Sequence, residues 1–261
     1  MRLAKKSLGQ NFLIDKNIIG KIISLIKLND RHVIEIGPGH GALTNEILKK
    51  KPRSLTLIEK DINLFNSLKK KYSKNKKITI YNSDILKFNL EKICKQNSAI
   101  FGNLPYNISS QILIKILKFK KWPPKSNDLI FMFQKELGEK IIGKFKSKNY
   151  GRLSILTNYR MSFLKKFFVS NNCFFPKPKV TSIVIHFRPF ERTTFKLKNI
   201  ENLEKVTNIM FSNKRKMINK NIKKILNLNQ IAKLSNLNLY SRPSEISPEI
   251  YYKIAELFEK R

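Results

Sequence analysis

The chain has 261 residues, of which 41% are hydrophobic, so it can bury a sizeable core and is not a disordered polymer. Its 53 Lys and Arg residues against 18 Asp and Glu residues give a net charge of +35, which favours a polyanionic partner, RNA or DNA. Most of this excess is lysine, which an AT-rich genome also favours, so charge alone names no activity. No apolar run approaches the ~20 residues that cross a bilayer, and the two cysteines lack disulfide or metal-ligand spacing. We therefore expect a cytoplasmic protein with no membrane anchor and no metal.

Apolar runs alternate with helical patterns along the first two thirds of the chain. Five runs read as strands, and helical spacing follows most of them: RHVIEIGPG (31–39), SLTLIEKD (54–61), KITIYNSD (77–84), SAIFGNLPY (98–106) and NDLIFMFQKE (127–136). This order predicts βαβ units and a doubly wound, mostly parallel α/β sheet. Two further runs, residues 163–170 and 180–187, are close enough in sequence to pair antiparallel.

The pattern changes near Arg192. From about residue 196 onward the chain reads as three helices with no strand candidate. The sequence therefore predicts an α/β domain over residues 1–192 and a small all-α domain over residues 193–261.

A glycine turn and two acidic residues follow three of the predicted strands. Gly37-Pro38-Gly39 begins a G-x-G-x-G turn, which differs from the dinucleotide fingerprint G-x-G-x-x-G, and Pro38 removes an N–H that a pyrophosphate would use. Glu59 ends the second strand, where a carboxylate can accept from ribose hydroxyls, and Asp84 ends the third, where it can accept from an adenine amino group. Together these residues predict an adenosine-bearing ligand with no diphosphate.

The fourth strand ends in Asn103-Leu104-Pro105-Tyr106, an unusual end for a core strand. This strand lies beside the first one across the switch point of such a sheet, so Asn103 is expected next to the ligand. The Asn103 carbonyl and the backbone carbonyls of the loop can accept from an exocyclic aryl amine, while Tyr106 stacks on its ring. Two acceptors stabilise the positive charge that develops on the amine nitrogen, so no strong base is required. The alternative is a helix-start turn in which Asn103 or Ser109 is a cap.

The sequence resembles the ribosomal small-subunit RNA adenine N6,N6-dimethyltransferases, the KsgA/RsmA family. Nine motifs match in order over nearly the whole chain: LGQNFL (8–13), EIGPGHGALT (35–44), IEKD (58–61), NSDIL (82–86), FGNLPYNIS (101–109), FMFQKE (131–136), YGRLS (150–154), FFPKPKVTS (174–182) and NKRKMI (213–218). The resemblance implies a Rossmann-like fold, a seven-stranded sheet with one antiparallel strand, and S-adenosylmethionine as methyl donor. It implies two adjacent adenines in the 3′-terminal hairpin of 16S rRNA as acceptors, in the small subunit or its precursor, with a role in subunit maturation. We expect a monomer.

The same resemblance assigns the site residues. The cofactor is expected to contact Asn11, Leu13, Gly37, Gly39, Glu59, Asp84 and Asn103. The predicted catalytic residues are Asn103, Leu104, Tyr106 and Phe174. Phe174 would form the second stacking wall opposite Tyr106, held by two rigid prolines; the alternative is simple core burial.

The C-terminal region contains a candidate RNA-binding face. In a helix expected around FSNKRKMINKNIKKIL (211–226), four apolar residues fall on one stripe: Phe211, Ile218, Ile222 and Ile225. Four lysines fall on the opposite side: Lys216, Lys220, Lys223 and Lys224. These lysines are RNA-backbone candidates, and an ordinary solvated face is the alternative.

Four other functions share part of this pattern. A nicotinamide-dependent dehydrogenase has the turn and the ribose acid but no use for N-L-P-Y. A DNA adenine methyltransferase differs in substrate, and a non-catalytic ribosome-assembly factor has no need of an intact amine site. The large-subunit adenine methyltransferases that confer macrolide resistance come nearest; the NKRKM region and the C-terminal helices favour the small-subunit family.

Overall fold

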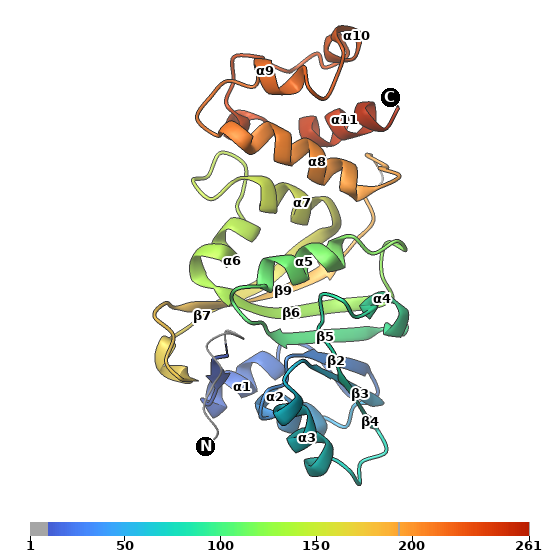
Figure 1. Ribbon diagram of the computed structural model, residues 1–261, viewed down its shortest axis with the longest axis vertical. Coiled ribbons are helices and arrows are strands. Elements are labelled where there is room, and N and C mark those ends of the chain that lie inside the picture. Colours follow the sequence, from blue (N-terminus) through green and yellow to red (C-terminus); the bar gives the residue numbers. More distant parts are fainter. Residues whose placement is uncertain (1–9, 193, 261) are drawn as a thin grey trace. The chain divides into compact units, whose positions relative to one another are not determined.

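The computed structural model describes residues 10–192 and 194–260, which divide into two compact units. The first unit comprises residues 1–138 and 163–189, and the second comprises residues 139–162 and 190–261. Residues 1–9, 193 and 261 lie outside the described part, and with them residues 8 and 9 of the first motif. Figure 1 shows the elements in chain order.

A seven-stranded sheet organises the first unit, in the order β4-β3-β2-β5-β6-β9-β7. Its strands are β2 (His32–Ile36), β3 (Ser54–Glu59), β4 (Ile78–Asn82), β5 (Ser98–Asn103), β6 (Ser126–Gln134), β7 (Met161–Val169) and β9 (Ser182–Pro189). The strands β4, β3, β2, β5 and β6 pair in parallel, and β9 pairs antiparallel with β6. The expected mostly parallel sheet with an antiparallel strand is confirmed, and the two runs expected to pair, β7 and β9, are neighbours.

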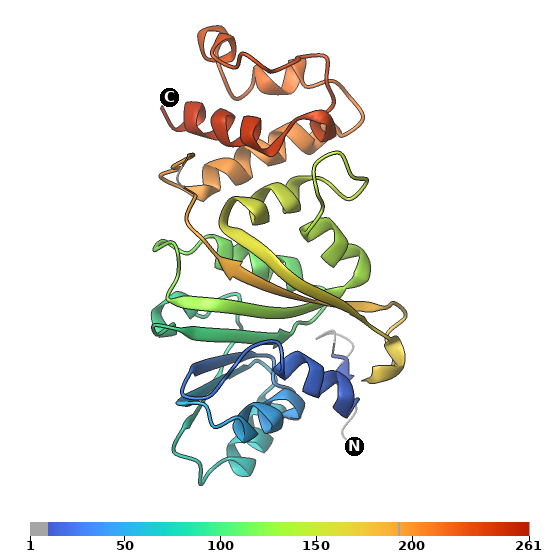
Figure 2. The ribbon, with the colours of Figure 1, turned by 180° about the vertical axis from the view of Figure 1, so that it is seen from behind.

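Helices cover both faces of this sheet. They are α1 (Lys16–Ile23), α2 (Ala42–Lys49), α3 (Ile62–Lys71), α4 (Leu90–Ile93), α5 (Ser109–Leu117) and α6 (Lys135–Ile141), the last ending in the second unit. Apolar residues of α1 and α2 share a core with alternate residues of the central strands, such as Val33, Leu55 and Phe101. Because β2 and β5 are buried on both faces, their sequences are mostly apolar rather than alternating, with Glu35 the acidic exception in β2. Figures 1 and 2 show α5 and α1 on opposite sides of the sheet.

A small sheet joins the start of the described chain to the segment before β9. It pairs β1 (Phe12–Leu13) antiparallel with β8 (Phe174–Phe175), which follows the 3-10 turn η2 (Asn171–Cys173). Ile14 extends the pairing, since its N–H donates to the carbonyl of Cys173 at 2.9 Å.

The second unit is helical. It contains α7 (Arg152–Arg160), α8 (Ile200–Met210), η3 (Phe211–Asn213), α9 (Asn219–Ile222), α10 (Leu228–Ala232), η4 (Pro243–Glu245) and α11 (Pro248–Glu259). The sequence predicted three helices after residue 196. Within residues 194–260 the structure has four helices and two 3-10 turns.

The compact units differ from the expected division at residue 192 in residues 139–162 and, at the boundary itself, in residues 190–192. Residues 139–162 belong to the helical unit, because α7 packs with the C-terminal helix. The Tyr159 and Tyr252 rings lie 5.0 Å apart, and the Tyr252 hydroxyl donates to the Ile155 carbonyl at 3.3 Å. The Tyr150 hydroxyl similarly donates to the Ile246 carbonyl at 2.8 Å. Contacts with residues almost 100 positions later in the sequence therefore place residues 139–162 in the helical unit.

Candidate functional site

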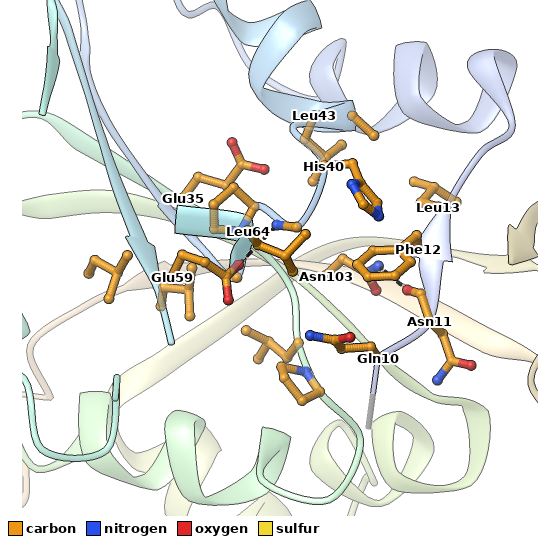
Figure 3. Close-up of a pocket in the computed structure, with 18 of the residues that line it drawn as sticks. Gln10, Asn11, Phe12, Leu13, Glu35, His40, Leu43, Glu59, Leu64 and Asn103 are labelled. Carbon is orange, nitrogen blue, oxygen red and sulfur yellow. Dashed lines mark hydrogen bonds between the residues drawn. The ribbon is translucent and has the colours of Figure 1, made fainter. Parts of the chain in front are cut away.

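A cavity of about 690 Å³ opens at the carboxyl ends of the parallel strands, within the first unit. This is the edge at which open α/β sheets bind ligands. Figure 3 shows its labelled side chains around the turn after β2, the end of β3 and the end of β5. Its lining includes all seven predicted cofactor residues: Asn11, Leu13, Gly37, Gly39, Glu59, Asp84 and Asn103.

The glycine turn leaves space for a ligand. Gly37, Gly39 and Gly41 have φ values of +66°, +59° and +81°, in the left-handed region that favours glycine. A Cβ added at Gly37 would meet a single described atom within 4 Å, the backbone carbonyl oxygen of Asn103 at 4.0 Å. The added Cβ would therefore project into open cavity space. This turn therefore brings backbone to the cavity wall at a point where any side chain would take up ligand volume.

Glu59 ties the turn to the next helix. Its Oε2 accepts from the Gly39 N–H at 3.1 Å, and its Oε1 accepts from the Asp61 N–H at 2.8 Å. Burial raises the pKa of the carboxyl group, while the two backbone hydrogen bonds oppose that shift. Each carboxylate oxygen can accept more than one hydrogen bond, so the fixed group remains able to receive a pair of ribose hydroxyls.

Asp84 lies at another part of the cavity lining with a cationic partner. Its Oδ2 is 2.9 Å from Lys60 Nζ, and its Oδ1 accepts from the Leu86 N–H at 2.9 Å. The hydrogen bond from Lys60 lowers the pKa of Asp84 despite partial burial. The carboxylate therefore stays ionised and can act as an acceptor for an amino group.

Asn103 has its amide orientation set by the backbone. Its Nδ2 donates to the Asn11 carbonyl oxygen at 2.9 Å, a bond between β5 and the segment before β1, drawn as a dashed line in Figure 3. A carbonyl oxygen accepts only, so the nitrogen and oxygen of this amide are assigned by their partner. The remaining group, Oδ1, is the acceptor that Asn103 offers to the cavity. The absence of a side chain at Gly102 leaves room for the Leu104 side chain, because a Cβ at residue 102 would collide with it.

Tyr106 is held by the antiparallel strand. Its hydroxyl forms a 2.6 Å hydrogen bond with Ser182 Oγ at the start of β9, and its backbone carbonyl accepts from Ser109 Oγ at 3.2 Å. Burial raises the pKa of the phenol, although the Ser182 bond opposes the shift. The ring is therefore a neutral, fixed surface in the cavity wall, and Leu104 lines the cavity beside it.

Phe174 does not lie where the sequence predicted. It pairs with Leu13 in the small sheet, is 3% exposed and belongs to the core cluster under the main sheet. The next residue, Phe175, is 50% exposed and lines the cavity. Alternation along an extended strand turns these two rings to opposite faces. The alternative of core burial therefore describes the position of Phe174.

Sequence reasoning missed Glu35 and a pair of rings. Glu35, within β2, lines the cavity, is 1% exposed and accepts from Thr44 Oγ1 at 2.6 Å; burial raises its pKa to about 7. The sequence signal for this site residue was an acidic residue inside an apolar strand, two residues before the glycine turn. Phe12 and His40 also line the cavity, and their rings lie 4.4 Å apart.

The candidate RNA-binding lysines lie in the second unit. Lys216, Lys220, Lys223 and Lys224 are all exposed, and the predicted apolar stripe of Phe211, Ile218, Ile222 and Ile225 is buried. The prediction that a single helix carries these lysines is wrong, because this segment forms η3, a turn and the short helix α9.

The described residues offer neither a metal-binding cluster nor a membrane-spanning helix. Within residues 10–192 and 194–260, no group of three or more His, Cys, Asp or Glu residues is arranged to hold a metal ion. None of the described helices is long and apolar enough to span a membrane.

Comparison with known proteins gives consistent similarities. The family model described as ribosomal RNA adenine dimethylase matches residues 1–260. A Pelagibacter ubique protein named ribosomal RNA small subunit methyltransferase A is 44% identical over 260 residues, covering 98% of this chain and 97% of its own. A Malacoplasma penetrans protein of the same name is 39% identical over 256 residues, covering 96% and 90%.

Two solved structures have the same fold over 95% of this chain. The dimethyladenosine transferase of Plasmodium falciparum aligns with a TM-score of 0.77 at 23% identity, over 98% of its own chain. The 23S rRNA methyltransferase ErmE aligns with a TM-score of 0.68 at 25% identity, over 100% of its own chain.

Proposed function

This chain belongs to the ribosomal RNA adenine dimethylase family, and from that premise we propose that it methylates small-subunit ribosomal RNA. The reaction transfers methyl groups from S-adenosylmethionine to N6 of two adjacent adenines in the 3′-terminal hairpin of 16S rRNA, giving N6,N6-dimethyladenosine. The modification contributes to maturation of the small subunit. The relatives at 39–44% identity that are named small subunit methyltransferases favour this substrate over 23S rRNA, although ErmE shares the fold.

The chemistry of the cavity lining supports S-adenosylmethionine as the cofactor. The open space over Gly37 accommodates ligand atoms, Glu59 can accept from the ribose hydroxyls, and Asp84 can accept from the adenine amino group. Two buried carboxyl groups, Glu35 and Glu59, suit a ligand with cationic groups. When bound, the cofactor supplies a methyl group on a positively charged sulfur.

The tethered amide of Asn103 is the observation that carries the mechanism. Because Nδ2 is bonded to the Asn11 carbonyl, Oδ1 can accept an N–H of the adenine N6 amine. A loop carbonyl next to it can accept the second N–H, and Tyr106 supports the ring. As the nitrogen uses its lone pair to bond to the methyl carbon, the bond from that carbon to the donor sulfur would break and its electron pair would stay on the sulfur. Positive charge then develops on the nitrogen, and these fixed acceptors stabilise that charge without reorganising. The proton then leaves to water.

Mapping methylated adenines tests the reaction. Small subunits with unmethylated rRNA are incubated with the protein and S-adenosylmethionine, and the digested RNA is analysed by mass spectrometry. The expected product is dimethyladenosine at two adjacent positions near the 3′ end of 16S rRNA. Methylation of 23S rRNA alone, or of DNA, would contradict the proposed substrate.

Asn103→Ala tests the mechanism. Removing one preorganised contact to developing charge costs about 10²–10³ in kcat, while cofactor affinity should change less. Asn11→Ala is the comparison variant, because it leaves the backbone carbonyl that holds Asn103. It removes a predicted cofactor contact and should weaken cofactor affinity, whereas kcat at saturating cofactor should fall much less than in Asn103→Ala. Asn103→Asp keeps an acceptor but loses the donor to Asn11, and it should also be impaired. Dimethylation by Asn103→Ala at the wild-type rate would show that the loop is only a helix-start turn.

A further inference from the structure

An exposed surface of rings and lysines borders the Tyr106 side of the cavity, within the first unit. We call it the Phe168 surface and define it by five exposed residues: Lys135, Phe168, Phe175, Lys177 and Lys179. Phe168 and Phe175 are each 50% exposed. Phe168 lies on β7, the strand at one edge of the main sheet.

Short contacts connect Phe168 to the acceptor side of the cavity. The Lys135 ammonium lies 5.1 Å from the centre of the Phe168 ring. The Lys135 N–H donates to the Thr181 carbonyl at 2.9 Å, and the neighbouring Ser182 holds the Tyr106 hydroxyl at 2.6 Å. A series of contacts therefore links Phe168 to Tyr106 through Lys135, which follows β6, and through Thr181 and Ser182 at the start of β9. Phe175 reaches the same cavity from β8 and lines it.

The chemistry of this surface suits a nucleic-acid strand. Residues 161–182 contain four lysines and no acidic residue. Aromatic rings beside cations provide stacking faces for bases and counter-charges for phosphates, the combination used by proteins that bind single strands. Lysines on an edge strand also block pairing with another sheet, which accounts for Lys165 and Lys166. That role does not require the half-exposed rings of Phe168 and Phe175.

We propose that Phe168 stacks on the base of a nucleotide flanking the target adenine in single-stranded RNA, with Lys135, Lys177 and Lys179 contacting the adjoining phosphates. This inference rests on the proposed function, since it assumes that an adenine in RNA enters the cavity. It adds a positioning site for the neighbouring nucleotide. One base–aromatic contact of this kind is worth about 5- to 150-fold in RNA affinity.

Phe168→Ala and Phe163→Ala form a matched pair of variants. Phe163 is also on β7, is 39% exposed and has the Lys166 ammonium 6.0 Å from its ring centre. It lies five residues earlier, so alternation places it on the opposite face of the strand. With unmethylated small subunits as substrate, Phe168→Ala should lower kcat/KM by about 5- to 150-fold. Phe163→Ala should stay within about twofold of wild type, and both variants should bind cofactor as wild type does. Phe168→Trp should restore the activity.

A binding cycle identifies the stacked base without requiring catalysis. The probe is a synthetic RNA hairpin with two adjacent loop adenines, in which each flanking loop nucleotide is replaced in turn by an abasic one. One replacement should weaken binding to wild type but not weaken binding to Phe168→Ala any further, because the same contact is already absent. Additive losses at every position, or equal behaviour of the Phe168 and Phe163 variants, would overturn the proposal.

The remaining outcomes separate this inference from its premise. If wild type transfers no methyl group to small subunits, the proposed function fails, and the binding cycle still decides whether Phe168 stacks on RNA. If Phe168→Ala changes the molar mass by light scattering while RNA binding stays at the wild-type level, the surface is a protein interface and the inference is wrong.

Discussion

The buried carboxyl group of Glu35 gives the cavity a titration near neutral pH. Burial raises its pKa from an ordinary 4.5 to about 7, although the Thr44 hydroxyl donates to it and opposes the shift. A cationic ligand favours the ionised form, so S-adenosylmethionine should bind most tightly above pH 7. Its affinity should fall by up to about tenfold per pH unit as the pH decreases below 7, since binding must then expel a proton.

Calorimetry between pH 7.5 and 6 checks this pH dependence. Glu35→Gln cannot titrate and should flatten the profile. Adenosine provides the ligand control, because it lacks the sulfonium and the ammonium and should bind with little pH dependence. A steep profile that persists in Glu35→Gln would assign the titration to another group, such as Glu59, whose pKa is also raised by burial.

Residues at strand ends were predictable, and residues inside strands were not. Gly37, Glu59 and Asp84 each lie at or just after the carboxyl end of a strand. The carboxyl ends of parallel strands meet at one edge, so the convergence of these residues in the cavity follows from the sequence. Glu35 belongs to an apolar run that reads as core, and only the assembled sheet shows that its carboxyl group borders the cavity. The bond from Asn103 to the Asn11 carbonyl joins residues 92 positions apart, which no local pattern indicates.

At the scale of elements, the short strand β8 separates a core ring from a surface ring. Phe174→Ala should lower the free energy of unfolding by about 3–5 kcal/mol, as expected when a buried phenylalanine is truncated. Phe175→Ala removes a half-exposed ring from the same strand and should cost much less. Denaturant unfolding of the two variants measures both values. A Phe174→Ala variant as stable as wild type, but defective in methylation, would support the stacking role that the sequence predicted.

The broken helix after α8 shows where periodicity fails. Apolar residues at 211, 218, 222 and 225 fit a helical stripe, and all four are buried. However, the Ile218 N–H donates to the Ser241 carbonyl at 3.0 Å, and the buried Asn221 side chain donates to the Met210 carbonyl at 3.4 Å. Asparagine side chains compete in this way with helical hydrogen bonds. The burial pattern could be predicted, but the break depends on a partner more than 20 residues away.

At the scale of the whole molecule, the cavity and the candidate lysines belong to different compact units. Cofactor binding and RNA-backbone binding should therefore be separable by mutation. Replacing Lys216, Lys220 and Lys223 by alanine removes three exposed charges from the second unit. If each lysine contacts one phosphate, the slope of log affinity for small subunits against log salt should decrease in magnitude by about 2–3, at roughly 0.7–0.9 per contact.

A triple variant in the first unit matches this change in charge. Lys74, Lys76 and Lys77 are exposed and precede β4, at the amino ends of the strands and so opposite the edge that forms the cavity. Their replacement by alanine removes the same net charge, and the salt slope should stay near the wild-type value. Filter binding over a range of salt concentrations gives the slopes, and calorimetry should give wild-type cofactor affinity for both triple variants. Equal slopes for the two variants would place Lys216, Lys220 and Lys223 on an ordinary solvated face, because net charge alone would then account for the attraction to RNA.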